Sequence, residues 1–144
     1  MADSPQPLTP SARRRAARSA SARRRAARSA RLQAGALAGM GLLHVIRPGA
    51  FDTLIPPALP GPAQAWTYGS GVAELSVAAL LAAPAARRIG GWAAVGLYLA
   101  VWPGNVQMAW DARHASPTRR IITLARLPLQ LPMIRAGLRV ARGA

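Results

Sequence analysis

Apolar residues gather in four segments along the chain, with polar residues between them. The segments cover residues 32–46, 65–83, 89–110 and 121–140. The last three each reach about the 20 residues that an α-helix needs to cross a bilayer. The first is shorter and carries Gly35 and Gly39 at the small-xxx-small spacing of close helix contacts. The pattern predicts an all-α fold, a transmembrane four-helix bundle formed by residues 32–144.

The composition favours a bilayer over water as the surroundings of these segments. Hydrophobic residues make up 51% of the chain and charged residues only 16%, whereas a soluble domain carries about a quarter charged residues. No amphipathic segment is left over to cover the apolar ones. The chain has no cysteine, which excludes disulfides, thiolate metal sites and cysteine nucleophiles. With only two histidines, we expect no metal site.

Residues 1–31 form a basic arm that differs from the rest of the chain. Residues 1–10 are polar and rich in proline, which predicts disorder. The sequence SARRRAARSA then occurs twice, at 11–20 and 21–30. A ten-residue period advances a helix by about 280°, so the arginines spread around the axis and no apolar face forms. We therefore expect a solvated arm that is disordered or helical, with nothing to bury.

Three interpretations of this arm are open. It is a juxtamembrane segment that sets the topology and contacts anionic lipid, a binding segment for nucleic acid or an acidic partner, or a targeting sequence. The formal net charge of +15 is concentrated in the arm, so it describes the arm and not the domain. The charge is therefore no evidence that the domain binds nucleic acid, and nucleic acid is a disfavoured partner. The preferred interpretation is a juxtamembrane segment that contacts anionic lipid.

The arginines also predict an orientation. With the N-terminus in the cytoplasm, fourteen arginines fall on inner segments and four on outer loops. Inner segments of membrane proteins carry the excess of positive charge. The sequence therefore predicts a multi-pass protein of the cytoplasmic membrane with both termini in the cytoplasm. Trp66 and Trp110 would then lie at the outer interface, where aromatic residues are enriched.

Five polar side chains fall at membrane depth in this arrangement. With a rise of about 1.5 Å per residue, all five lie in the outer half of the bundle, and every helix supplies at least one: His44, Glu74, Asn105, Arg126 and Gln130. Ionisable groups at such depth are costly and need a partner or a purpose. Glu74 and Arg126 could form a buried ion pair, the cluster could hold a ligand such as a quinone, or it could carry protons or ions. The residues leave these alternatives open.

The polar positions lie in motifs that resemble those of the DoxX family of small membrane proteins. The similarity runs from about residue 35 to residue 137 and excludes the arm. Its motifs are GLLH at 41–44, IPPALP at 55–60, SGVAEL at 70–75, WPGN at 102–105 with Met108, and RLPLQ at 126–130. Two departures are modest: Val45 replaces the usual aromatic residue, and the third-helix motif usually reads Phe-Pro-Ala-Asn.

The resemblance implies a four-helix bundle related to the membrane subunit of thiosulfate:quinone oxidoreductases. The implied site consists of the same five residues, with quinone as a non-covalent ligand and no covalently bound cofactor. Electrons would have to come from a membrane or cytoplasmic redox partner, because the chain has no cysteine, metal cluster or nucleotide motif. Whether the chain is itself an enzyme stays open. The alternatives are a non-enzymatic scaffold or assembly protein and, less favoured, a small transporter component.

Overall fold

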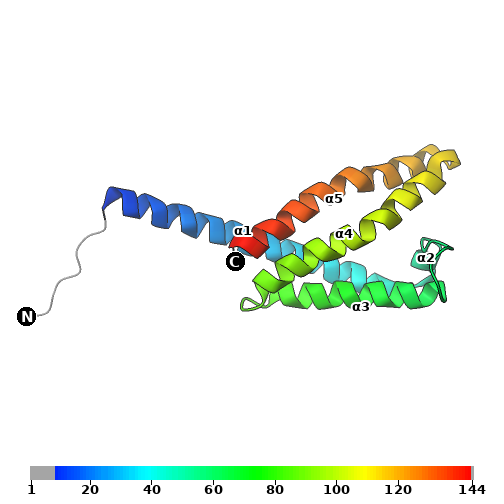
Figure 1. Ribbon diagram of the computed structural model, residues 1–144, viewed down its shortest axis with the longest axis horizontal. Helices are drawn as coiled ribbons and strands as arrows, with labels where there is room; N and C mark the ends of the chain where they lie inside the picture. Colours follow the sequence, from blue (N-terminus) through cyan, green and yellow to red (C-terminus); the bar gives the residue numbers. More distant parts are fainter. Residues whose placement is uncertain (1–8, 144) are drawn as a thin grey trace, which may run out of the picture.

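In the computed structural model, which describes residues 9–143, every regular element is a helix. Four long helices run antiparallel in a bundle (Figure 1): α1 (Pro10–Ile46), α3 (Ala63–Ala82), α4 (Arg87–Asp111) and α5 (Pro117–Gly143). A short helix, α2 (Gly49–Asp52), follows α1, and one turn of 3₁₀ helix, η1 (Ala112–His114), joins α4 to α5. The all-α prediction is confirmed. Each of the four apolar segments falls on one long helix.

The ends of α1 follow from local sequence. The side chain of Thr9 accepts a hydrogen bond of 3.3 Å from the backbone N–H of Ala12, and Pro10 occupies the first helical position, where its missing N–H costs nothing. The helix stops at Ile46 because Arg47 precedes Pro48, and a residue before proline is driven out of the helical conformation. Three internal prolines behave differently. Both α4, with Pro103, and α5, with Pro128 and Pro132, continue through them, so the interruption that the sequence suggests does not end either helix.

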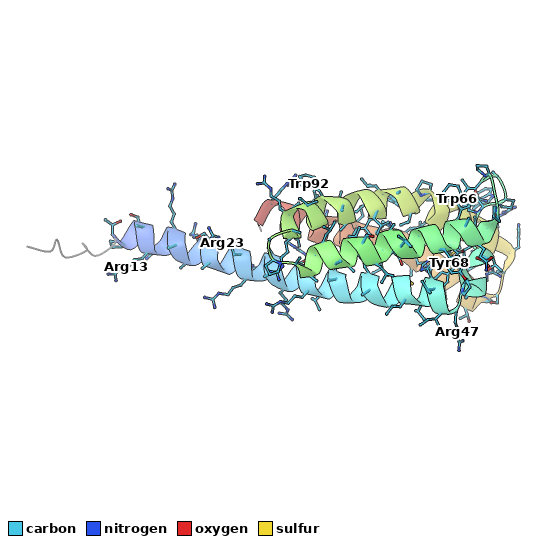
Figure 2. The ribbon with its side chains drawn as sticks, turned by 90° about the horizontal axis from the view of Figure 1, so that it is seen from below. Arg13, Arg23, Arg47, Trp66, Tyr68 and Trp92 are labelled. Atoms are coloured by element: carbon cyan, nitrogen blue, oxygen red, sulfur yellow. The ribbon has the colours of Figure 1, made fainter. Side chains whose placement is uncertain are left out.

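The basic arm is the first part of α1. Residues 10–31 are helical and run into the first apolar segment without a break, giving one helix of 37 residues that projects well beyond the bundle (Figures 1 and 2). The disorder expected for residues 1–10 falls largely on residues 1–8, which lie outside the described part. The expectation that the arm buries nothing is wrong for its second copy. Ala26 and Ala30 are buried, with 3% and 0% of their surface exposed.

The long helices are arranged as a ring of four neighbours. α1 packs beside α3 and α5, and α4 packs beside the same two helices, so α3 and α5 lie diagonally across the bundle. The closest associations are α1 with α3 and α4 with α5. The two pairs lie close together near the C-terminus and diverge toward the end that carries α2 (Figure 1).

Each close pair is held by a crossing of two glycines. At the α1–α3 crossing, a Cβ on Gly41 would lie 2.9 Å from the carbonyl oxygen of Gly71. At the α4–α5 crossing, a Cβ on Gly91 would lie 2.9 Å from the carbonyl oxygen of Gly137. Small residues let helix backbones approach this closely. The spacing of Gly35 and Gly39 had suggested that they do so, but neither has a neighbour within 4 Å of its Cβ position.

The buried core is narrow and made mainly of small side chains. Alanines contribute much of it, and the residues that form it are Ala30, Ala34, Leu37, Val77, Ala78, Leu81, Ala94, Tyr98 and Val140. Large apolar side chains instead point outward from every long helix.

Within residues 9–143, no helix combines enough length with enough hydropathy to qualify as a membrane span.

Candidate functional site

The side chains of His44 and Glu74 meet across the α1–α3 crossing. Nδ1 of His44 lies 3.2 Å from Oε2 of Glu74, and the glycines of the crossing place the two backbones close enough for these short side chains to meet. The same Nδ1 lies 2.9 Å from the carbonyl oxygen of Met40. Since Nδ1 carries a single hydrogen, the carbonyl takes the hydrogen bond, and the buried Oε2 is left without one.

Helix α2 covers the histidine of this pair. The ring of Phe51 stacks on the His44 ring with their centroids 3.8 Å apart. The next residue, Asp52, anchors α2 to α3, because its carboxylate accepts a hydrogen bond of 2.6 Å from the hydroxyl of Thr67. Thr67 is completely buried. The pair is therefore enclosed by a stacked ring and a second polar contact, and water has little access to it.

A second polar group links α1, α4 and α5. The hydroxyl of Tyr98 donates a hydrogen bond of 3.1 Å to Oε1 of Gln33. Gln130 donates from Nε2 to the carbonyl oxygen of Tyr98 and accepts at Oε1 a hydrogen bond of 3.0 Å from Nδ2 of Asn105. Tyr98, Gln33 and Gln130 are all buried. We call these four residues the amide–phenol chain.

Arg126 does not join either group. Its guanidinium is exposed and donates to Sδ of Met108 at 3.6 Å. Arg126 and Glu74 therefore do not form the ion pair that was one of the alternatives left open by the sequence, and the side chain that meets Glu74 in the described residues is that of His44. The reason is the helix order. Glu74 is on α3 and Arg126 is on α5, which lie diagonally across the bundle and diverge toward this end.

The five polar residues expected to form one cluster thus separate into two pairs and one exposed arginine. His44 meets Glu74, and Asn105 meets Gln130. Five further participants were missed: Gln33, Phe51, Asp52, Thr67 and Tyr98. A helical period could have found two of them. Thr67 lies seven residues before Glu74, and Tyr98 lies seven before Asn105, which is about two helical turns along the same face.

The amide–phenol chain satisfies its polar groups internally, so it acts first as a connection between helices. Its hydrogen bonds join α1 to α4 and α4 to α5. A buried polar group that loses its partner destabilises the folded state. The amide–phenol chain therefore favours the one alignment of the helices in which its hydrogen bonds form. In the described residues there is no group of three or more side chains that could hold a metal ion.

A small cleft opens on the outside of the α4–α5 pair near η1. It has a volume of about 320 Å³, and mainly apolar side chains line it, together with two arginines: Val106, Ala109, Trp110, Arg113, Arg120, Leu124 and Leu127. The guanidinium of Arg113 lies over the Trp110 ring, 4.7 Å from its centroid. We call this the α4–α5 cleft. An apolar lining with few polar donors is the usual character of a small-molecule site.

The comparison with protein families matches residues 33–141 to a domain of unknown function, DUF8561. The match covers more than half of the chain and includes the two glycine crossings, the His44–Glu74 pair and the amide–phenol chain. The chain belongs to this family. The matched region excludes the duplicated arm. No curated protein matches the chain, and no solved structure matches it.

Proposed function

We propose that this DUF8561 protein is embedded in a membrane as a four-helix bundle. The observation that carries the proposal is the exposure of large apolar side chains on every long helix, together with polar side chains that are buried. Leu32, Ile46 and Ile121 are 66%, 70% and 67% exposed, whereas Thr67 and Gln130 are 0% and 3% exposed. Polar side chains inside a bundle and apolar ones outside are typical of helices surrounded by lipid.

The ends of the bundle support the same placement. Trp92 is near the end where the arm projects, and Trp66 is near the opposite end (Figure 2). Both are at least 40% exposed, as expected for tryptophans at the two interfaces of a membrane. The C-terminal end of α5 lies beside the arm, so the arginines of both termini gather at one end (Figure 1). By the positive-inside rule this end faces the cytoplasm.

Within the membrane, the proposed role is that of a quinone-interacting subunit without an active centre of its own. The DoxX-like motifs support the ligand class. The α4–α5 cleft is the proposed binding site. Its Arg113 and Arg120 can donate hydrogen bonds to the carbonyl oxygens of a quinone, and its apolar side chains can contact the ring. Electrons pass to and from the quinone through a redox partner.

A scaffold or assembly role is the second candidate. The observation that favours it is the internal satisfaction of the amide–phenol chain, which leaves Asn105 and Gln130 engaged with each other. A protein whose polar residues serve only to align its helices needs no ligand. The scaffold role differs from the quinone role in one measurable respect, because it predicts that quinone does not change the thermal stability of the protein.

Membrane placement is tested first, on the full chain expressed in bacteria. The protein should remain in the pellet after alkaline carbonate extraction. A reporter active only in the periplasm should be silent at the C-terminus and active when inserted between Asp111 and Pro117. Release of the protein by carbonate would refute the membrane proposal, and a C-terminal reporter active in the periplasm would refute the orientation.

The quinone role is tested by thermal unfolding of the detergent-purified chain with and without ubiquinone-1. Arg120→Gln alters the cleft, and Arg119→Gln is its matched control, because the neighbouring arginine does not line the cleft. The wild type and Arg119→Gln should be stabilised equally, as a ligand stabilises the folded state that binds it, and Arg120→Gln should gain little. If ubiquinone-1 does not stabilise the wild type, the quinone role is refuted and the scaffold role is favoured. Equal stabilisation of all three proteins would refute the α4–α5 cleft as the site.

A further inference from the structure

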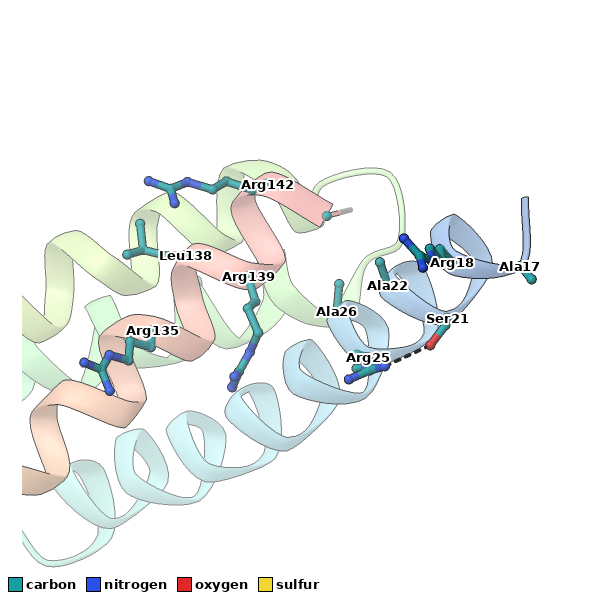
Figure 3. A pocket seen from close by; sticks show the side chains of 11 residues that line it. Ala17, Arg18, Ser21, Ala22, Arg25, Ala26, Arg135, Leu138, Arg139 and Arg142 are labelled. Atoms are coloured by element: carbon teal, nitrogen blue, oxygen red, sulfur yellow. Dashed lines mark hydrogen bonds between the residues drawn. The ribbon is translucent and has the colours of Figure 1, made fainter. Parts of the chain in front are cut away.

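A large cleft lies between the basic arm and the C-terminal end of α5. Its volume is about 840 Å³. Five arginines contribute to its lining, two from the arm and three from α5: Arg18, Arg25, Arg135, Arg139 and Arg142. Figure 3 shows Arg139 directed from α5 toward α1. We call this the arm cleft.

Among residues 9–143, no carboxylate pairs with the arginines of the arm cleft. Among residues 9–143 the carboxylates are those of Asp52, Glu74 and Asp111. Glu74 is paired with His44, and the other two lie at the far end of the bundle, where α2 and the end of α4 are found (Figure 1). Within the cleft, Arg25 donates a hydrogen bond of 3.2 Å to the neutral hydroxyl of Ser21 (Figure 3). Five positive charges that share one cleft repel each other, so an anion bound there would be strongly favoured.

The cleft also has an apolar side. Ala17, Ala22, Ala26 and Leu138 line it between the arginines. Ala26 is buried, and Gly143 of α5 comes close to it, since a Cβ on Gly143 would lie 3.4 Å from the Ala26 side chain. A free inorganic anion would use only the arginines. A lipid headgroup would use both sides, since its phosphate matches guanidinium groups and its glycerol and first methylenes match the alanines and leucine.

We propose that the arm cleft binds the headgroup of an anionic phospholipid with more than one phosphate. Guanidinium groups bind phosphate through paired N–H donors, and the arginines of the arm and those of α5 offer two separate sets of such donors. Basic pockets beside membrane helices on the cytoplasmic side are suited to such lipids. The lipid as the source of the phosphate rests on the membrane placement proposed above, whereas the anion chemistry rests on the cleft alone.

The duplication in the arm provides a matched control. Arg18 and Arg25 line the cleft, and their counterparts in the other copy, Arg28 and Arg15, do not. The double variants Arg18→Gln/Arg25→Gln and Arg15→Gln/Arg28→Gln therefore remove the same charge from the same local sequence. They differ only in where the arginines stand relative to α5.

The experiment titrates the full chain in neutral detergent with cardiolipin and, separately, phosphatidylcholine, and counts bound lipid by native mass spectrometry. The wild type and the Arg15/Arg28 variant should bind cardiolipin and not phosphatidylcholine. The Arg18/Arg25 variant should bind it about thirtyfold more weakly, because two phosphate contacts are lost. Helix content and melting temperature of both variants, measured by circular dichroism, show whether either has unfolded. If Arg18/Arg25 is unfolded, Arg139→Gln takes its place, with Arg119→Gln as its control.

Three outcomes would overturn the proposal. Equal weakening in the two double variants would mean that the arm attracts lipid by charge alone. Equal binding of cardiolipin and phosphatidylcholine would remove the preference for phosphate. Full displacement of cardiolipin by an equal concentration of pyrophosphate would make the ligand a free anion. The assay in detergent is independent of carbonate extraction, so failure of the cleft and failure of the membrane placement can be told apart.

Discussion

Replacing Gly91 with alanine tests whether a close backbone contact holds α4 against α5. The added methyl group would lie 2.5 Å from the backbone nitrogen of Ala141 and 2.9 Å from the carbonyl oxygen of Gly137. Both neighbours are backbone atoms of α5, so no side-chain rotation can relieve the overlap. Either α4 and α5 move apart, or the overlap remains and destabilises the folded variant.

The matched control is Gly96→Ala on the same helix. Nothing lies within 4 Å of the Cβ position of Gly96. Both substitutions gain the same helix propensity, about 1 kcal/mol for alanine over glycine. They differ in the cost of overpacking, about 1–3 kcal/mol. The expected difference between the two variants is therefore about 1–3 kcal/mol, with Gly96→Ala more stable than wild type and Gly91→Ala at or below it.

The free energy of unfolding is measured for all three proteins in one mild detergent, by circular dichroism at 222 nm during denaturant titration. Because the propensity gain is common to both variants, their difference isolates the contact at the crossing. If Gly91→Ala were as stable as Gly96→Ala, the backbones of α4 and α5 would not be in contact at Gly91.

Further predictions concern the polar residues, each measured by the same unfolding assay. Gln130→Leu should lower the free energy of unfolding by about 1–3 kcal/mol, because it leaves the partly buried amide of Asn105 without its acceptor; stability equal to wild type would contradict the amide–phenol chain. Tyr98→Phe should cost about 1–2 kcal/mol through the lost hydrogen bond to Gln33, and no loss would mean that this bond does not form. Arg126→Gln should change stability by less than about 0.5 kcal/mol, since its guanidinium is exposed, and a large loss would restore a structural role for that arginine.

The helices themselves could be predicted from the sequence. The apolar segments, the arginine-rich interruptions and the prolines at 48, 62, 84 and 117 place four long helices with short connections. Local rules are sufficient here, because helix propensity and the effect of proline act over a few residues. The internal prolines are the exception. Tertiary packing keeps α4 and α5 helical through Pro103, Pro128 and Pro132.

Partner choice in the candidate site could not be predicted. From residue type alone, Arg126 is a natural partner of Glu74, since it has the opposite charge and also falls in the outer half of the predicted bundle. The order of the helices decides otherwise, because it puts α1 beside α3 and α5 across from it. His44 then meets the carboxylate. The position of a residue along its helix does not indicate which helices are neighbours around the axis of the bundle.

The duplicated arm separates the two kinds of information most clearly. Its copies have the same ten residues, so local sequence predicts one conformation for both, and both are helical. Yet Ala26 and Ala30 of the second copy are buried, while their counterparts Ala16 and Ala20 are exposed. Composition and helix propensity account for the helical conformation of the arm. Burial depends on whether α5 reaches that turn of the helix, and only the tertiary structure decides this.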